Sequence, residues 1–370
     1  MLQEPHLSTV LDCADASIKA GIVGCRGWIT LDKPKSYNAL TLPMIRAIRR
    51  VLDMFAEEER VRCISIASAV PNVFCAGGDI RAVRTASLAG RHDENEAFFS
   101  EEYQLNLLIA NYPKPYMALI DGICMGGGMG LSVHGRHRVV TASLKMAMPE
   151  TSIGYFPDVG ASYFLGQLPL GLGNFLALTG HSMSAEDAMY CGLANLRVSS
   201  ATFVSLMLPT FDFTSPSSLT ALAMPSTKVG HLEMHDKDIE QCFNVPRLGD
   251  IFDQLRRHQS PWSEQTLAML KKSSPTSLVL TFELMRRCRN RCLAECLDNE
   301  LKLTRKITRS ADFMEGVRAA LVEKDKKPSW HPQQLSDVDA SAYFDDEAQL
   351  PRVGRRALNH SPPKRNGTIN

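Results

Sequence analysis

A glycine-rich stretch followed closely by two carboxylates constrains the fold of this chain more than any other feature. Residues 122–160 read GICMGGGMGLSVHGRHRVVTASLKMAMPETSIGYFPDVG. Glycines at a tight turn leave backbone N–H groups open to a reacting carbonyl, because no Cβ stands in the way. Glu150 and Asp158, which follow, can act as a base or a nucleophile. The pattern therefore predicts an active site for acyl-group chemistry.

The size and composition of the chain are typical of a soluble globular protein. It has 370 residues, of which 44% are apolar and 22% charged, and a formal net charge of +1. This nearly neutral balance does not indicate a nucleic-acid binder. No apolar run approaches the roughly 20 residues needed to cross a bilayer, so we expect no membrane partner.

Ten cysteines are scattered along the chain without a CxxC pair, so neither a zinc ribbon nor a thioredoxin-like site is indicated. Cys288, Cys292 and Cys296 recur every four residues and should share one helix face, where packing is favoured over a metal site. His134 and His137 do not match the HExxH zinc pattern. We predict no metal site and interpret the thiols as buried groups in a reducing compartment.

Short apolar runs alternate with helical periodicity in the first half of the chain. This alternation is typical of an α/β domain with parallel strands. Thr41 is a plausible N-cap, and Ser184 with Asp187 approximates a capping box. Strands are expected at residues 27–31, 62–67, 116–120 and 138–141, and helices at 44–55, 98–110, 128–135, 170–179 and 184–191.

Composition shifts after about residue 198, where Ser, Thr and Pro begin to dominate. Their concentration at residues 214–227 indicates a loop or boundary, and helical periodicity follows it. The helices expected there span residues 250–258, 263–272, 276–310 and 312–324. The basic, breaker-rich tail is expected to be disordered. We divide the chain into an N-terminal extension (1–24), a core (25–213), a helical C-terminal region (214–350) and the tail (351–370).

Two glycine turns, CAGGD and MGGGMG, each follow an apolar run that reads as a strand. Aimed at one point, their N–H groups would bind a carbonyl oxygen that becomes negative during reaction. Their spacing matches neither a dinucleotide fingerprint nor a P-loop. Simple tight turns remain an alternative for the glycines, helix caps for Glu150 and Asp158, and a solvated helix face for Glu102.

Three segments together resemble a known family. They read AGGDIR (76–81), IDGICMGGGMGLSVHGRHRV (120–139) and AMPETSIGYFPDVGASYFL (147–165). The chain resembles the crotonase (enoyl-CoA hydratase/isomerase) superfamily over roughly residues 25–335, and is most similar to its 3-hydroxyisobutyryl-CoA hydrolase branch. The resemblance implies an α/β fold, a crotonase-like spiral of ββα turns with a C-terminal helical region.

The resemblance also implies roles for individual residues. Gly78 and Gly127 would supply the two N–H groups that bind the thioester carbonyl. Glu102, Glu150 and Asp158 match the branch's substrate-contacting and catalytic carboxylates. The implied substrate is an acyl-CoA thioester, with no cofactor apart from the coenzyme A that the substrate carries. The implied setting is valine breakdown in mitochondria, although the N-terminus shows no clear presequence.

A departure from the wider superfamily selects the reaction. Hydratases use two glutamates to add water across a double bond; the second matches Glu150, whereas the first falls on Gly130. Hydration is therefore disfavoured, and thioester hydrolysis remains feasible. Glu150 would attack the carbonyl or activate water, and Asp158 would orient or exchange the proton. Ala161 and Ser162 replace glycines that are common in the branch, which leaves the acyl preference open.

The expected function is hydrolysis of 3-hydroxyisobutyryl-CoA to 3-hydroxyisobutyrate and coenzyme A. Two alternatives stay open: another crotonase-type acyl-CoA activity, and a structural role in the mitochondrial small ribosomal subunit. The arginine run at residues 286–291 and the basic tail would suit association with ribosomal RNA. Trimers or hexamers are usual in the superfamily, which implies a homo-oligomer.

Overall fold

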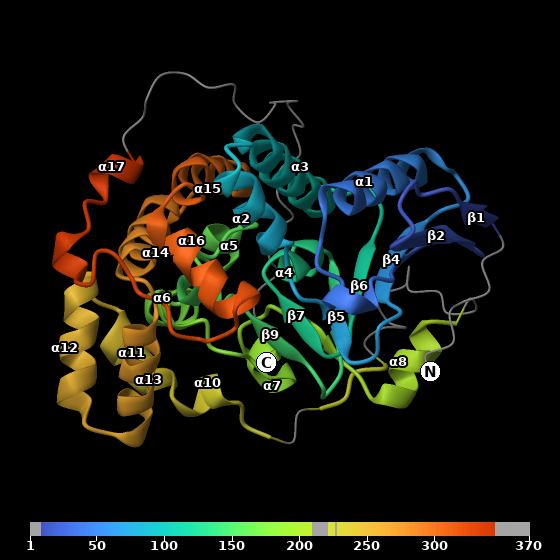
Figure 1. The fold of residues 1–370 in the computed structure, drawn as a ribbon. Coiled ribbons are helices and arrows are strands. Elements are labelled where there is room, and N and C mark those ends of the chain that lie inside the picture. The colour runs from blue at the N-terminus through green and yellow to red at the C-terminus, as the bar shows by residue number, and fades with distance from the viewer. Residues whose placement is uncertain (1–8, 209–220, 226–227, 345–370) are drawn as a thin grey trace.

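A seven-stranded sheet is the framework of the first half of the chain (Figure 1). The computed structural model describes residues 9–208, 221–225 and 228–344. Every strand pair from β3 onward is parallel, whereas β2 runs antiparallel to both β1 and β3. In sheet order the strands are β1 (Thr9–Leu11), β2 (Ile18–Val23), β3 (Arg26–Leu31), β4 (Cys63–Ser68), β6 (Tyr116–Ile120), β8 (His137–Val140) and β10 (Leu196–Arg197).

A second, three-stranded parallel sheet shows how the chain advances. The three turns that begin at β4, β6 and β8 each add one strand to the large sheet and one to the small sheet, and then enter a helix or helical turn. This arrangement confirms the expected α/β class and the spiral of ββα turns. The elements of these turns outside the large sheet are β5 (Val73–Cys75), α2 (Ile80–Leu88), α3 (His92–Ala110), β7 (Ile123–Met125), α4 (Gly127–Ser132), β9 (Lys145–Ala147) and η2 (Glu150–Ile153).

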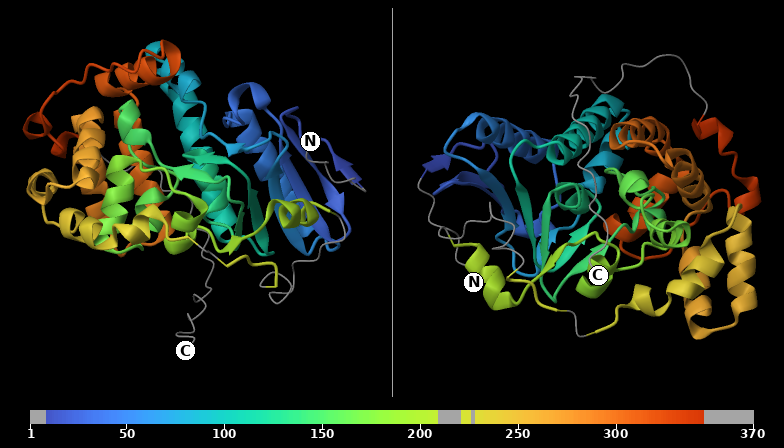
Figure 2. Two further views of the ribbon diagram at one scale, coloured as in Figure 1. Left: turned by 90° about the horizontal axis from the view of Figure 1, so that it is seen from below. Right: turned by 180° about the vertical axis from the view of Figure 1, so that it is seen from behind.

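The large sheet is buried on both faces. Along β6, Ala118 joins the main core, whereas its neighbour Leu119 joins a second core on the opposite face, as the alternation of a strand requires. α1 (Leu42–Glu57) covers the first face and α8 (Ser200–Leu206) the second (Figure 2). Burial on two faces explains why these strands read as continuous apolar runs.

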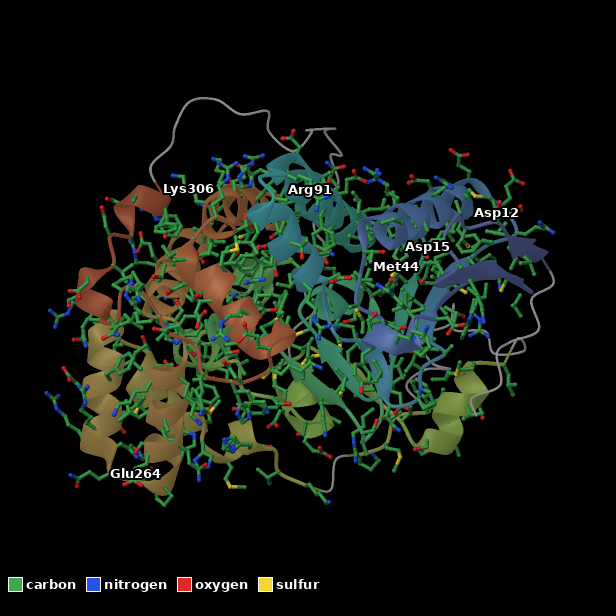
Figure 3. The ribbon with its side chains drawn as sticks, viewed as in Figure 1. Asp12, Asp15, Met44, Arg91, Glu264 and Lys306 are labelled. Carbon is green, nitrogen blue, oxygen red and sulfur yellow. The ribbon has the colours of Figure 1, made fainter. Side chains whose placement is uncertain are left out.

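The first long helix shows why the sequence folds this way locally. The Thr41 hydroxyl caps α1 by accepting a hydrogen bond from the Met44 N–H at 3.5 Å, and Pro43 stands in the first turn, as predicted. Figure 3 labels Met44, which lies on the buried face of the helix. The other large apolar residues of that face recur at helical spacing: Ile45, Ile48, Val51, Leu52 and Phe55.

The sheet begins earlier than the sequence indicated. β1 and β2 lie within the first 24 residues, where no strand was predicted, and β2 pairs with β3 along its whole length. The division of the chain into four regions stays a prediction. Residues 351–370 and most of the boundary at 214–227 lie outside the described part of the chain.

Helices form most of the described part of the chain after α4, and the C-terminal ones lie beside the spiral rather than over the large sheet (Figures 1 and 2). The Ser184–Asp187 capping box predicted for α7 is present.

In the described residues, no helix is both long and apolar enough to cross a membrane. The remaining elements are η1 (Pro34–Ser36), α5 (Ala161–Phe164), α6 (Leu170–Thr179), α7 (Ala185–Tyr190), α10 (His231–Met234), α11 (Asp236–Phe243), α12 (Leu248–His258), α13 (Pro261–Lys272), α14 (Pro275–Cys288), α15 (Leu293–Ile307), α16 (Ala311–Val317), η3 (Arg318–Val322), η4 (Leu335–Asp337) and α17 (Ser341–Phe344).

The prediction of one helix over residues 276–310 is wrong. α14 ends at Cys288 and α15 begins at Leu293, and Asn290 between them has a left-handed φ of 63°. Cys292 is the exposed N-cap of α15, whereas Cys288 and Cys296 are buried. The three cysteines therefore do not share one helix face, because their spacing crosses a break between two helices.

Candidate active site

The two glycine turns lie against each other. They follow β5 and β7, which are neighbouring parallel strands, so both turns leave the same edge of the small sheet. A Cβ built on Gly127 would lie 3.4 Å from the backbone nitrogen of Gly78, and one on Gly77 would lie 3.6 Å from the nitrogen of Gly127. Gly77 has a positive φ of 107°, a backbone conformation that favours glycine, and a Cβ on Gly127 would collide with the Glu102 carboxylate.

The N–H groups of both turns have room for an acceptor. Gly127 is the first residue of α4, so its N–H has no acceptor within the helix. Leu40 pairs with the first turn through two hydrogen bonds: its N–H donates to the Gly77 carbonyl, and its carbonyl accepts from the Asp79 N–H. Neither hydrogen bond involves the N–H of Gly78. The structure thus brings Gly78 and Gly127 together as an oxyanion site would require.

The three predicted carboxylates converge on these turns from different elements. Glu102 comes from the middle of α3, and a side chain on Gly127 would collide with its Oε1. Glu150 is the first residue of η2, and a Cβ on Gly126 would lie 2.8 Å from its Oε1. Asp158 follows in the next loop, and its negative charge raises the pKa of both glutamates. All three side chains are buried.

Glu102 and Glu150 each keep one oxygen unbonded. Oε1 of Glu102 and Oε2 of Glu150 are buried and have no hydrogen-bond partner among the described residues. Buried polar atoms are normally paired, so these two oxygens are available to a ligand. Asp158 differs, because its Oδ2 accepts a hydrogen bond of 2.8 Å from the Tyr103 hydroxyl.

Burial changes the acidity of the whole cluster. Loss of water raises the pKa of Glu102 and of Glu150 well above the usual range, and the neighbouring Asp158 raises both further. Burial also raises the pKa of Asp158 to about 7, against the opposing effect of the Tyr103 hydrogen bond. Like charges in one dry site cannot all ionise together. The cluster therefore holds at least one proton at neutral pH and can exchange it.

A carboxylate from the C-terminal region holds the loop that carries Asp158. Oε2 of Glu300 on α15 accepts a hydrogen bond of 2.7 Å from the Gly160 N–H. Its Oε1 accepts from the N–H and the hydroxyl of Ser162 at 3.0 and 2.5 Å. Ser162, noted in the sequence as a departure from its relatives, therefore directs its hydroxyl toward Glu300.

Two tyrosines join the same loop to α15. The Tyr155 hydroxyl lies 2.7 Å from the Thr304 hydroxyl and 3.5 Å from Oδ2 of Asp158. The Tyr103 hydroxyl also lies 3.1 Å from Thr304. On the other side of the loop, Nε2 of His134 donates a 2.7 Å hydrogen bond to the Val159 carbonyl, and burial lowers the His134 pKa to about 4. His134 is thus a neutral support of the loop.

The structure gives a physical reason for the glycine at position 130. A Cβ there would lie 2.8 Å from Nδ2 of Asn106 and 2.9 Å from Cβ of Val159. The place that a longer side chain would enter is occupied by these two residues. A hydratase-type carboxylate cannot be added at this position without displacing them.

All five residues predicted for the site lie together, whereas their chemical roles stay predictions. Sequence reasoning did not identify Asn106, Tyr103, Tyr155 or Glu300. Asn106 alone carries a local signal, since it lies one helical turn after Glu102 and on the same face of α3. Within the described residues, no group of three or more His, Cys, Asp or Glu side chains is arranged to hold a metal ion.

Comparison with known proteins agrees with this geometry. Residues 26–345 match the model of a family described as enoyl-CoA hydratase/isomerase. The chain is 41% identical to the mitochondrial 3-hydroxyisobutyryl-CoA hydrolase of Rattus norvegicus, over 93% of this chain and 92% of the relative. It is 40% identical to the Homo sapiens protein of the same name, over 85% and 84% of the two chains.

Solved structures resemble this protein over most of its chain. A carnitinyl-CoA dehydratase from Mycobacterium thermoresistibile superimposes with a TM-score of 0.86 at 33% identity, over 92% of this chain and 99% of that one. An enoyl-CoA hydratase from Rhodobacter sphaeroides 2.4.1 gives a TM-score of 0.81 at 33% identity, over 89% and 97% of the two chains. The similarity therefore includes the helical C-terminal region as well as the spiral.

Proposed function

Because this chain belongs to the enoyl-CoA hydratase/isomerase family, we propose that it hydrolyses 3-hydroxyisobutyryl-CoA to 3-hydroxyisobutyrate and coenzyme A. The relatives described above as 3-hydroxyisobutyryl-CoA hydrolases are about 40% identical to it over most of both chains. The structural observation that carries the proposal is the pairing of two glycine turns with Glu150 beside a position 130 that is closed to a second glutamate. That combination favours hydrolysis over hydration.

The reaction can be written with the groups that the site provides. Attack on the thioester carbon moves an electron pair onto the carbonyl oxygen, which accepts hydrogen bonds from the N–H groups of Gly78 and Gly127. Collapse of the intermediate breaks the C–S bond, and the thiolate of coenzyme A takes up a proton. Either Glu150 attacks, and water then cleaves the mixed anhydride, or Glu150 removes a proton from the attacking water.

Asp158 is suited to handle the proton in either route. Its pKa of about 7 lets it both hold and release a proton near neutral pH. Its charge raises the pKa of Glu150, so protonation of Asp158 favours the ionised Glu150 that the reaction needs. Glu102, which faces Gly127, would contact the substrate. These groups can complete hydrolysis with no cofactor beyond the coenzyme A of the substrate.

The test is a panel of acyl-CoA thioesters assayed for free thiol and for the acyl product. We expect the wild-type protein to release thiol from 3-hydroxyisobutyryl-CoA and to add no water to enoyl-CoA substrates. Glu150→Gln should lower kcat by at least about a hundredfold, as expected for loss of a base or nucleophile. Glu101→Gln is the matched control, because Glu101 is bound to Arg46 on the outer side of α3.

An unchanged rate in Glu150→Gln would show that Glu150 has no chemical role. Absence of thiol release by the wild type, together with formation of another product, would replace hydrolysis with a different acyl-CoA activity.

The names of the relatives bear on the cellular location and on one of the alternative roles. Those relatives are named mitochondrial, and on that ground we propose a mitochondrial location for this protein. A role in valine breakdown stays a prediction from the resemblance. The relatives' names are those of enzymes and give no support to a ribosomal role. A homo-oligomer stays a prediction from the resemblance.

A further inference from the structure

Asn106 is a buried amide with nothing to bind inside the protein. It has no exposed surface, and neither Nδ2 nor Oδ1 has a hydrogen-bond partner among the described residues. Most buried amides are paired, and leaving one unpaired costs about 1–3 kcal/mol. Asn95, on the same helix, follows the usual pattern, because its Nδ2 donates to the Val83 carbonyl and to the Ser87 hydroxyl. The Asn106 amide is therefore available to form hydrogen bonds with a bound ligand.

The position of Asn106 relates it to the acyl chain of the substrate. Glu102 and Asn106 lie one turn apart on α3, and Gly127 and Gly130 lie one turn apart on α4. Glu102 lies against Gly127, and Asn106 lies against Gly130. Gly130 follows Gly127 by three residues, a rise of about 4.5 Å along α4, so the amide lies roughly one helical turn from the glycine that would hold the thioester carbonyl. An acyl substituent three bonds from the carbonyl carbon reaches that depth.

We infer that the side-chain amide of Asn106 binds the 3-hydroxyl group of the acyl chain and selects thioesters that carry it. This inference rests on the proposed function. A hydroxyl group is one donor and also an acceptor, so a single 3-hydroxyl can accept from Nδ2 and donate to Oδ1. An ionised carboxylate at this place would only accept, whereas the amide satisfies both sides of the hydroxyl without adding a fourth acidic group to the cluster.

An ordered water molecule could also satisfy the amide, and the two cases differ in one measurable respect. If Asn106 positions the hydrolytic water, its loss slows the hydrolysis of every thioester equally. If it binds the 3-hydroxyl, its loss affects only substrates that possess this group. A site that pairs with a substrate hydroxyl discriminates strongly against the analogue that lacks it.

The experiment compares 3-hydroxyisobutyryl-CoA with isobutyryl-CoA, which differs only in the hydroxyl, in the full chain and in Asn106→Leu. Leucine has a similar volume and no polar atom. We expect kcat/KM for the hydroxylated substrate to fall by about 10- to 100-fold, the equivalent of one to two lost hydrogen bonds. The value for isobutyryl-CoA should change by less than about threefold. Asn111→Leu, at the exposed end of α3, is the control and should change neither.

Equal losses on both substrates would overturn the inference. If Asn106→Leu does not fold, as thermal unfolding would show, the wild-type protein still decides. A preference of tenfold or more for the hydroxylated substrate supports the inference, and equal kcat/KM values overturn it. Failure of the proposed function is distinguishable, because the wild type would then release thiol from neither substrate.

Discussion

Glu300 determines the position of the Asp158 loop, although it lies far from that loop in the sequence. Both of its oxygens accept hydrogen bonds, one from the Gly160 N–H and the other from the N–H and hydroxyl of Ser162. Burial raises the pKa of Glu300 well above its usual range, against the opposing effect of these donors. A side chain with only one accepting oxygen cannot satisfy this set.

We predict that Glu300→Gln will lower both stability and activity. The amide nitrogen of glutamine would face at least one backbone N–H, so one buried donor loses its acceptor. The expected cost is about 1–3 kcal/mol in the free energy of unfolding, measured by chemical denaturation. Because the loop carries Asp158, kcat should also fall. Asp298→Asn on the outer side of α15 is the control and should leave both values within error. Wild-type stability in Glu300→Gln would refute this role.

At the residue scale, the sequence was most informative where chemistry depends on residue type. Glu102, Glu150 and Asp158 were recognised through their resemblance to a family, and the structure brings them together. Glu300 was not recognised, because a buried glutamate on a helix reads like any other and its partners lie 138 and 140 positions away. Contacts over such separations leave no local pattern.

At the scale of elements, a stack of histidines joins helices of the C-terminal region. His181, just after α6, stacks on His231 of α10 with ring centroids 4.5 Å apart, and His231 lies 4.7 Å from His235. Burial, together with the neighbouring His231 and His235, lowers the His181 pKa to about 4, against the opposing effect of Asp187. The stack is therefore stable only while His181 is neutral.

This arrangement predicts acid sensitivity with a definite sign. Between pH 6.5 and about 4 the unfolded chain binds a proton on His181, whereas the folded chain does not. The contribution of His181 to stability is thus complete above pH 6.5 and is progressively lost as the pH falls toward 4. His181→Phe keeps an aromatic ring without a titrating group, so its free energy of unfolding should fall less steeply over this range.

Denaturation at several pH values measures the two slopes. Asp158 and His134 titrate in both proteins, so the difference between the slopes isolates His181. Parallel slopes would contradict the prediction.

Helices were predicted well where a capping residue or the helical spacing of apolar residues marks them in the sequence. α6 was predicted with its observed ends, and the cap of α1 was identified. The break between α14 and α15 was missed, because apolar spacing continues across it and neither Pro nor Gly marks it. Asn290 adopts the left-handed conformation that more often signals glycine.

At the scale of the molecule, the C-terminal helices and the spiral meet backbone to backbone. A side chain on Gly154, at the end of η2, would overlap the Asp312 carbonyl of α16, and one on Gly316 would overlap the backbone of Ile153. This close approach fixes α16 against the turn that carries Glu150. The sequence predicted a helical C-terminal region but not this contact, which depends on two glycines from distant segments.

We predict that Gly316→Ala will separate α16 from η2. The added methyl group must displace the Ile153 backbone, which should cost about 1–3 kcal/mol in the free energy of unfolding. Activity should fall too, because Glu150 begins η2. Gly249→Ala is the matched control, since a Cβ at Gly249 meets nothing within 4 Å. Thermal unfolding and thiol release measure the two effects; equal behaviour of the two variants would refute the prediction.

The dependence of the Asp158 loop on Glu300 has a consequence for how the protein is made. During synthesis the glycine turns, Glu102, Glu150 and Asp158 leave the ribosome long before α15 does. Until Glu300 and Thr304 emerge, the Asp158 loop lacks its hydrogen bonds to α15, and the nascent chain carries the reactive groups without their complete support. The complete active site can therefore form only late in translation. A chain that stops before α15 would be inactive toward thioesters.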